Sequence, residues 1–510
     1  MAWRTGWLVS LLVMGVGCGG PLPGEEDEPP ASSEDLLTPR DAQCSLPSSD
    51  STKRVKTILP PSQIGIPRFA EAPNGFVKFK GQLYFAVNFE DGQRALWKSN
   101  GTEAGTTHIQ GFPATDGRFT RPLASLAAGP TRLFFQVPDL THGNELWVSD
   151  GTTAGTRLVK DLTPGTVGST LSHLTALGDR LVFFKEIYDS ATVQTRYELW
   201  TSDGTAAGTA RIRDFGWGRE VSVKDAAEGG ALRFFVLGPD GVGTVLWKTD
   251  GTPAGSIPVK TLTSSEDAFI WDIQTRDSVS LFVMREHTGL QELWKSDGMS
   301  SGTVRLASFG PTRVARLVGR LGSWVYVAVT SLSSQYMVLY RVPLSGGNPT
   351  PVVSLPNDYA SLGEAFPSIE ETSSVPGGTK LYFSVSIGSE GPAPRDTQLW
   401  VTDGSAAGTL LLRRPLSLSD EYRSPVVAVQ DDLVFFSAFE GETLGIEPWV
   451  SDGTPEKTRK LKDISHTGVT GSSYPRDFFR LGSRVYFSAY DDTLAGQLWS
   501  TVLRCTGETP

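Results

Sequence analysis

The chain is poor in the residues that commonly build catalytic and metal sites. Of its 510 residues, three are cysteine and five are histidine. The cysteines lack the close pairing that zinc sites use, and the sequence contains no His-Glu-x-x-His, Gly-x-x-x-x-Gly-Lys-Ser/Thr or Gly-x-Ser-x-Gly motif. We therefore predict no catalytic, cofactor-binding or metal-binding residues, and we expect that the chain is not an enzyme.

Excess basic charge and long apolar runs are also missing. The net charge is −10 and the isoelectric point is about 5.2, which argues against nucleic acid as a partner. The main apolar stretch is Trp7 to Val16, which is too short to cross a bilayer as a stable helix.

The amino terminus instead resembles an export signal. Arg4 supplies a positive charge ahead of the apolar stretch, and the run from Met14 to Cys18 resembles the lipobox of bacterial lipoproteins. Gly15 departs from the leucine that the lipobox prefers. We predict a lipoprotein signal peptide at residues 1–17, lipidation of Cys18, and anchoring to the bacterial outer membrane or cell surface. Plain secretion is the alternative.

Residues 18–52 are rich in proline, serine and acidic residues. Low hydrophobicity with one sign of charge is typical of a disordered tether.

The rest of the chain is a repeat of about fifty residues. Each copy has a short apolar strand such as Leu181 to Phe184, then a Leu-Trp strand, an Asp-Gly-Thr turn and a return strand such as Leu158 to Leu162. The nine aromatic anchors of the Leu-Trp strands are predicted core residues: Trp97, Trp147, Trp200, Trp247, Trp294, Tyr340, Trp400, Trp449 and Trp499.

Both sides of the Leu-Trp strand must be buried. Leu146 and Trp147 are consecutive, so they point to opposite faces of one strand, and both residue types recur in nearly every copy. Four-stranded sheets packed between similar sheets satisfy this requirement. We predict an all-β fold, a single β-propeller of about nine four-stranded blades over residues 53–505, with a short tail at 506–510. The sixth copy has lost the turn motif, so eight true blades are the alternative.

The repeated Asp-Gly-Thr segments carry turn chemistry, because glycine accepts a positive φ and an Asp oxygen can accept hydrogen bonds from the turn. We predict structural roles for Asp150, Asp203, Asp250, Asp297, Asp403 and Asp452. Calcium binding is the alternative, although each loop offers one carboxylate where calcium loops cluster several.

The two ends of the repeat region complement each other. The last copy ends near Val502 without a return strand, while Arg54 to Ile58 match a return strand that has no copy of its own. We predict that the amino-terminal strand completes the last blade and closes the ring. Cys44 and Cys505 flank these strands, so we predict a disulfide between them, with two free thiols as the alternative.

Three copies match one pattern fully: Glu145-Leu146-Trp147, Glu198-Leu199-Trp200 and Glu292-Leu293-Trp294, each followed by Asp-Gly. Residues 54 to 503 thereby resemble the ELWxxDGT repeat family of exported bacterial proteins. The resemblance implies a propeller-like array outside the cell and no agreed activity.

The predicted function is a binding module for an unknown protein or glycan, attached to the membrane by its lipid and otherwise monomeric. A hydrolase of polysaccharide or peptide with a site in the central funnel is one alternative. Its candidate carboxylates lie in the seventh copy: Glu364, Glu370, Glu371 and Asp396. A structural scaffold of the envelope is the other alternative.

Overall fold

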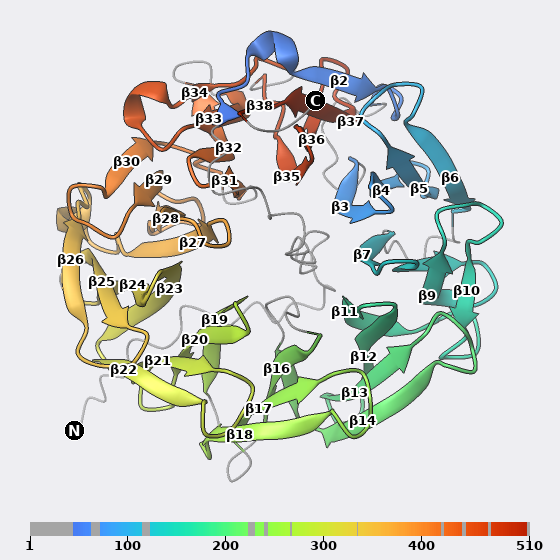
Figure 1. The fold of residues 1–510 in the computed structure, drawn as a ribbon, viewed down its shortest axis with the longest axis horizontal. Helices are drawn as coiled ribbons and strands as arrows, with labels where there is room; N and C mark the ends of the chain where they lie inside the picture. The colour runs from blue at the N-terminus through green and yellow to red at the C-terminus, as the bar shows by residue number, and fades with distance from the viewer. Residues whose placement is uncertain are drawn as a thin grey trace, which may run out of the picture.

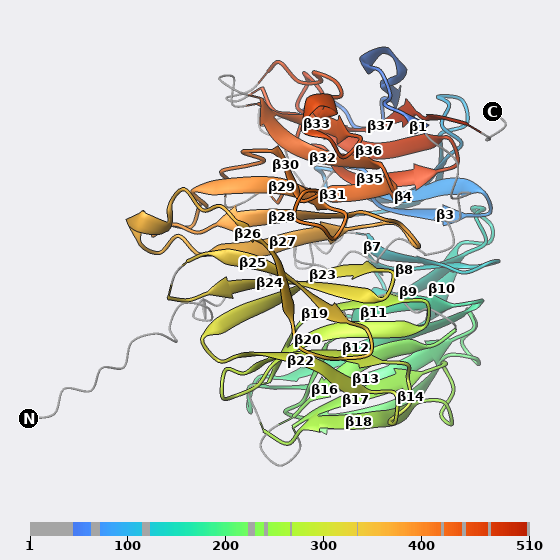
Figure 2. The same cartoon turned by 60° about the vertical axis from the view of Figure 1, so that its left-hand side comes forward.

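The protein is a closed ring of nine four-stranded antiparallel sheets (Figure 1). The computed structural model describes residues 44–62, 72–114, 123–222, 230–238, 243–265, 268–333, 335–419, 423–440, 445–467 and 471–506. In each blade the first strand lies nearest the ring axis and the last strand lies at the rim, and Figure 2 shows the sheets stacked face to face. The predicted nine-bladed propeller is confirmed.

The first four blades follow the chain in order. Their strands are β3 (Asn74–Phe79), β4 (Gln82–Asn88), β5 (Arg94–Ser99) and β6 (Thr107–Phe112); β7 (Ala124–Ala128), β8 (Leu133–Asp139), β9 (Gly143–Ser149) and β10 (Arg157–Lys160); β11 (Thr170–Leu177), β12 (Arg180–Asp189), β13 (Gln194–Ser202) and β14 (Ala210–Trp217); β15 (Glu220–Ser222), β16 (Leu232–Leu237), β17 (Thr244–Thr249) and β18 (Ile257–Thr263).

The next four blades repeat this order. Their strands are β19 (Phe269–Arg276), β20 (Val279–Arg285), β21 (Gln291–Ser296) and β22 (Val304–Gly310); β23 (Arg313–Leu321), β24 (Trp324–Ser331), β25 (Met337–Pro343) and β26 (Thr350–Leu355); β27 (Pro367–Ser373), β28 (Leu381–Ile387), β29 (Asp396–Thr402) and β30 (Leu410–Arg413); β31 (Val426–Gln430), β32 (Leu433–Glu440), β33 (Gly445–Ser451) and β34 (Arg459–Lys460).

The ninth blade combines the two ends of the chain. It contains β35 (Arg476–Leu481), β36 (Arg484–Tyr490), β37 (Gly496–Val502) and, as its rim strand, β2 (Lys53–Lys56). A two-stranded sheet of β1 (Cys44–Ser45) and β38 (Arg504–Cys505) lies beside it. Three short 3₁₀ helices complete the described elements: η2 (Ser49–Ser51), η4 (Ala360–Leu362) and η6 (Pro455–Lys457).

The third blade shows why the sheets must stack. Phe183 pairs with Trp200 and Phe184 pairs with Leu199 across β12 and β13. Phe183 and Trp200 pack into a cluster shared with the second blade, whereas Phe184 and Leu199 pack into a cluster shared with the fourth. Successive residues of one strand therefore bury opposite faces, as the sequence predicts.

Nine apolar clusters occupy the nine seams between neighbouring blades, and each cluster contains buried residues of both blades. The seam between the ninth and first blades is built like the others, with Tyr486 and Leu498 packed against Leu83 and Phe85. Burial of one such side chain contributes about 1.5–3 kcal/mol to stability. An open ring would expose every apolar side chain of this seam to water and would lose that contribution from each of them. The anchors Trp400, Trp449 and Trp499 are buried, and the other six pack at their seams half-buried.

Ring closure uses the predicted strand pair. β2 runs antiparallel to β37, with Lys53 opposite Ser500 and Arg54 opposite Trp499. Arg54 also forms an ion pair with Asp491 at 2.7 Å. Beyond β2, the Gln497 side chain accepts a hydrogen bond from the Ile58 N–H at 2.8 Å and donates one to the Leu59 carbonyl at 2.9 Å.

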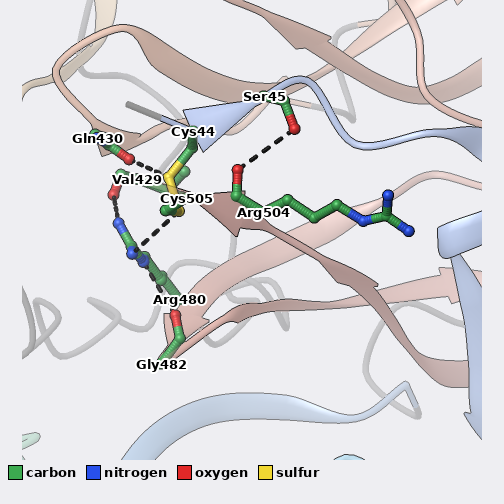
Figure 3. The surroundings of a disulfide bond; sticks show 8 residues. All are labelled: Cys44, Ser45, Val429, Gln430, Arg480, Gly482, Arg504 and Cys505. Carbon is green, nitrogen blue, oxygen red and sulfur yellow. Dashed lines mark hydrogen bonds between the residues drawn. A yellow bond between two sulfur atoms is a disulfide. The ribbon is translucent and has the colours of Figure 1, made fainter. Parts of the chain in front are cut away.

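The predicted disulfide joins Cys44 to Cys505, which are opposite residues of β1 and β38 (Figure 3). Arg480 lies beneath it and donates to the carbonyls of Val429 (2.9 Å) and Gly482 (3.2 Å). Residues 44–52 are therefore part of the described fold, although the prediction placed them in the tether. The bridge and the pairing with β38 hold them there, whereas the composition of the segment is that of a tether.

The sixth copy forms a regular blade although its turn motif is lost. Tyr340 takes the anchor position and packs edge-on against Phe309 of the fifth blade at 6.1 Å between ring centroids. The predicted signal peptide, Cys18 and most of the predicted tether lie outside the described residues. In the part of the chain that is described, no helix has the length and apolar character needed to cross a bilayer.

We expect the double variant C44S/C505S to lower the free energy of unfolding by about 2–5 kcal/mol, because the disulfide closes a loop that spans 461 residues of the chain. The measurement is denaturant unfolding at equilibrium. C18S is the matched control and should leave the midpoint unchanged. An unchanged midpoint for the double variant would show that the bridge contributes nothing to closure.

Candidate functional site

The ring has two faces with different loops. On one face lie the turns between the first and second strands and the Asp-Gly-Thr turns between the third and fourth strands; we call it the Asp-Gly face. On the other face lie the turns between the second and third strands and the connections between blades; we call it the connection face.

On the Asp-Gly face, the repeated carboxylates bond within their own turns. Asp150 Oδ1 accepts hydrogen bonds from the N–H of Thr152 (2.9 Å) and from its hydroxyl (2.7 Å), and Thr152 Oγ1 accepts one from the Gly155 N–H (3.0 Å). The hydroxyl bond lowers the pKa of Asp150. The carboxylates of the other Asp-Gly turns accept bonds from their own turns in the same way: Asp203, Asp250, Asp297, Asp403 and Asp452.

Glycine is required at two positions of this turn, because a Cβ at either one would collide with a neighbouring side chain. Gly151 has φ +90°, and a Cβ there would lie 2.4 Å from the Tyr84 hydroxyl of the preceding blade. A Cβ at Gly155 would lie 2.1 Å from the Asp150 carboxylate. Lysines of neighbouring blades donate to the turn carbonyls, as Lys80 does to Asp150 (2.8 Å). The turn is thus a structural joint between blades.

The buried glutamate of the repeat motif has one of two hydrogen-bonding arrangements, depending on the copy. Glu145 Oε1 accepts hydrogen bonds from the Thr163 N–H (3.0 Å) and the Ser169 hydroxyl (2.9 Å), so it holds the connection to the third blade. Glu447 binds the following connection in the same manner through Ile464 and Ser473.

Glu198 and Glu292 show the second arrangement. Each accepts a hydrogen bond from the indole N–H of the tryptophan two residues later, at 3.0 and 3.1 Å, and forms an ion pair with an arginine of the rim strand. All four glutamates stabilise the fold, a role that the repeat motif alone does not predict.

Burial raises the pKa of Glu145 to about 7 and that of Glu447 to about 8. Asp161 adds to the shift at Glu145, while its hydrogen-bond partners oppose it. A raised acid pKa in the folded state means that the folded protein keeps a proton that the unfolded chain releases above its ordinary value of 4.5.

A pocket of about 220 Å³ opens on the connection face at the seventh and eighth blades. Its walls come from β27 and β28, from the turn between β28 and β29, and from the connection to β31. It is lined by carboxylates, hydroxyls, one arginine and a few apolar residues, among them Glu370, Glu371, Ser384, Thr397, Leu416, Ser417, Arg423 and Ser424. Its volume suits one side chain or one sugar ring.

A bulge in β27 brings the two carboxylates into this wall. The register shifts between Ile369 and Thr372, so that Glu370 and Glu371 lie opposite the single residue Ser384, whose hydroxyl accepts the Glu371 N–H at 3.0 Å. The surrounding protein raises the pKa of Glu370, and the positive charges of Arg423 and Arg316 oppose that shift. Arg316 is itself paired with Asp272 at 2.9 Å.

One hydroxyl of the pocket lacks a partner. Ser424 is 9% exposed, and its Oγ has no hydrogen-bond partner among the described residues. Buried polar groups are normally bonded. This hydroxyl is therefore a candidate partner for a polar group that enters the pocket.

Of the four carboxylates named from the sequence, the structure brings Glu370 and Glu371 together in the pocket. Asp396 is buried and forms an ion pair with Arg414 at 3.0 Å, and Glu364 lies exposed in the connection between the sixth and seventh blades. Arg423 and the serines were missed, because they come from a connection that carries no motif. Among the described residues, no three His, Cys, Asp or Glu side chains are grouped so as to hold a metal ion.

No protein-family model matches the chain, and no curated protein matches it. Solved structures do match in part. A prolyl endopeptidase matches at 11% identity with a TM-score of 0.40, over 73% of this chain and 55% of its own. The β-propeller domain of the Trilobed protease from Pyrococcus furiosus matches at 13% and 0.36, over 67% and 99%. A puromycin-hydrolyzing peptidase of Mycobacterium tuberculosis matches at 14% and 0.42, over 88% and 61%.

These matches correct the expectation that the chain is not an enzyme. The matched proteins are two peptidases and the β-propeller domain of a protease, and this chain spans just over half of the prolyl endopeptidase. The expectation itself rested on the absence of a catalytic motif alone. At these identities and TM-scores the matches also carry no argument for a particular activity.

We expect the free energy of unfolding to fall as pH rises from about 5 to about 8, because over this interval the folded protein holds protons on Glu145 and Glu447 that the unfolded chain has lost. E145Q should reduce the total decrease in the free energy of unfolding over this pH range by about 3 kcal/mol. The amide keeps the Oε1 acceptor, and Oε2 has no hydrogen-bond partner among the described residues. Denaturant unfolding across this pH range is the measurement, with exposed E103Q as control. An equal slope for E145Q and wild type would contradict the assignment.

We also expect D250A to lower the free energy of unfolding by about 1 kcal/mol, and D250N to lower it less, because the amide oxygen still accepts the Thr252 bonds. Calcium or a chelator should leave the melting temperature of the wild-type protein unchanged. A calcium-dependent rise that D250A abolishes would favour the metal-binding alternative.

Proposed function

We propose that this protein is an exported, lipid-anchored propeller of the ELWxxDGT repeat type that binds a group of a protein or glycan through its connection face. The single observation that supports the proposal is the pocket at the seventh and eighth blades, where the buried hydroxyl of Ser424 has no partner in the described part of the chain and lies in one lining with two carboxylates and Arg423.

The position of the disulfide shows on which face the described chain enters the ring. Cys505 follows the end of β37, and Cys44 lies beside it near Gln430 at the end of β31 (Figure 3). These strand ends belong to the Asp-Gly face. The described chain therefore enters the fold on the face opposite the pocket. We propose a monomer, because the strands at the chain ends pair with each other.

We expect the pocket to take a single polar or cationic group. The test is saturable binding to the full-length protein of a panel of arginine amide, lysine amide and simple mono- and disaccharides, measured by calorimetry. E371Q and S424A should each weaken the binding of a responding compound by about tenfold, which is about the worth of one hydrogen bond to a charged group.

E390Q is the matched control, because Glu390 lies exposed in the same blade outside the pocket lining. Its affinity should equal that of the wild type. The absence of saturable binding across the panel, or an equal loss in E390Q, would contradict the proposed site.

A hydrolase of polysaccharide or peptide is the second candidate. The raised pKa of Glu370 favours it, because a carboxyl that keeps its proton can act as a general acid. Release of reducing sugar or peptide products that E370Q abolishes would support this candidate.

A further inference from the structure

Large apolar side chains are exposed almost entirely on one face. Of the thirteen such residues among the described ones, eleven lie in the turns, connections and strand ends of the connection face: Leu140, Val167, Tyr188, Val193, Trp217, Phe269, Leu332, Tyr336, Leu362, Phe366 and Leu418. The Asp-Gly face carries two, Ile257 and Met299. Scattered exposure would divide them evenly, so the asymmetry marks the connection face as a contact surface.

One group of these residues converges on the seam between the second and third blades. The turn that holds Leu140 meets the connection that holds Val167: the Ser169 N–H donates to the Asn144 carbonyl at 2.7 Å, and a Cβ on Gly143 would lie 2.7 Å from Val167.

Trp217 approaches the same seam from β14. It pairs with Arg196, whose guanidinium lies 5.9 Å from the centre of its ring. Arg196 lies on the same side of β13 as Trp200, which packs against the second blade. We call Leu140, Val167 and Trp217 the seam patch.

A second group adjoins the pocket. The turn between β24 and β25 carries Leu332 and Tyr336, and it is bonded to the connection that carries Leu362 and Phe366: the Gln335 side chain accepts the Ala365 N–H at 3.0 Å. The Phe366 carbonyl in turn accepts the Gly388 N–H at 3.1 Å, which links this group to the turn that lines the pocket. This second group is thus joined to the pocket through the turn between β28 and β29.

The same face is acidic. Among the described turns, connections and bordering strand residues, the exposed acids are Glu90, Asp91, Glu220, Asp358, Glu364, Glu390, Asp463 and Asp492, and Glu370 in the pocket wall is exposed as well. The exposed arginines there are Arg313 and Arg423. The Asp-Gly face mixes both signs, with exposed Lys80, Arg157, Arg180 and Lys457 among its acids. A partner of the connection face must therefore present apolar residues that are surrounded by positive charge.

We propose that the connection face docks a protein whose apolar contact residues are surrounded by lysine and arginine, with one basic side chain entering the pocket beside Glu370 and Glu371. Only the pocket contact rests on the proposed function. A protein fits better than a glycan, because Leu140, Val167, Leu332 and Leu362 offer no hydrogen bonds to sugar hydroxyls and the acids would attract basic side chains.

The test uses the full-length protein and three synthetic peptides of equal length: an amphipathic Leu/Lys helix, its Leu/Glu counterpart and an uncharged Leu/Gln version. We expect the Leu/Lys peptide to bind saturably and at least tenfold more tightly than the others, with an affinity that falls as salt rises. The seam variant V167S/W217S and the charge variant E364K/D492K should each weaken it about tenfold.

The matched controls lie on the Asp-Gly face: I257S/M299S for apolar exposure and E103K/E456K for charge. They should bind as the wild type does, and all variants should melt at the wild-type temperature. Equal binding of the Leu/Glu peptide, an equal loss in the controls, or saturable glycan binding that V167S/W217S abolishes would overturn the proposal. If S424A leaves peptide binding unchanged while the seam variant weakens it, the pocket proposal fails and the docking face stands.

Discussion

The architecture depends on one packing requirement: every four-stranded sheet of this chain is apolar on both faces. Such a sheet cannot be stable at the end of a row, because one face would remain in water. Nine seams filled by nine clusters meet the requirement only if the ninth blade packs against the first. The pairing of β2 with β37 in the ninth blade helps to close the ring, since it joins the two chain ends within one sheet.

The repeat motif follows from the same requirement. Trp200 and Leu199 fill opposite seams, Gly151 admits the tyrosine of a neighbouring blade, and the carboxylate of Asp150 closes its own turn. The motif glutamates either tie a connection to the Trp strand or bond the indole N–H. What repeats in the sequence is therefore structural, and the functional features lie where the copies differ.

This division explains how far the sequence could be read. Strand order and blade number are confirmed, because the repeat is a local signal that recurs along the chain. Ring closure and the Cys44–Cys505 bridge are confirmed, because the two chain ends carry complementary features. Glu371 and Ser424 line one pocket although a blade's length of chain separates them, and neither belongs to a motif. The acidic, apolar connection face was equally invisible, since loops of different blades meet only in the folded ring. The expectation about enzymatic activity failed because it treated the absence of a motif as evidence.

Closure of the ring is the claim on which the faces, the pocket and the docking surface all depend. Peptide mapping of the unreduced protein by mass spectrometry tests it most directly. The structure predicts one linked peptide pair containing Cys44 and Cys505 of the same molecule, in the monomeric fraction. Free thiols at both positions, or a link found only between two molecules, would contradict the disulfide-linked pairing of the two chain ends.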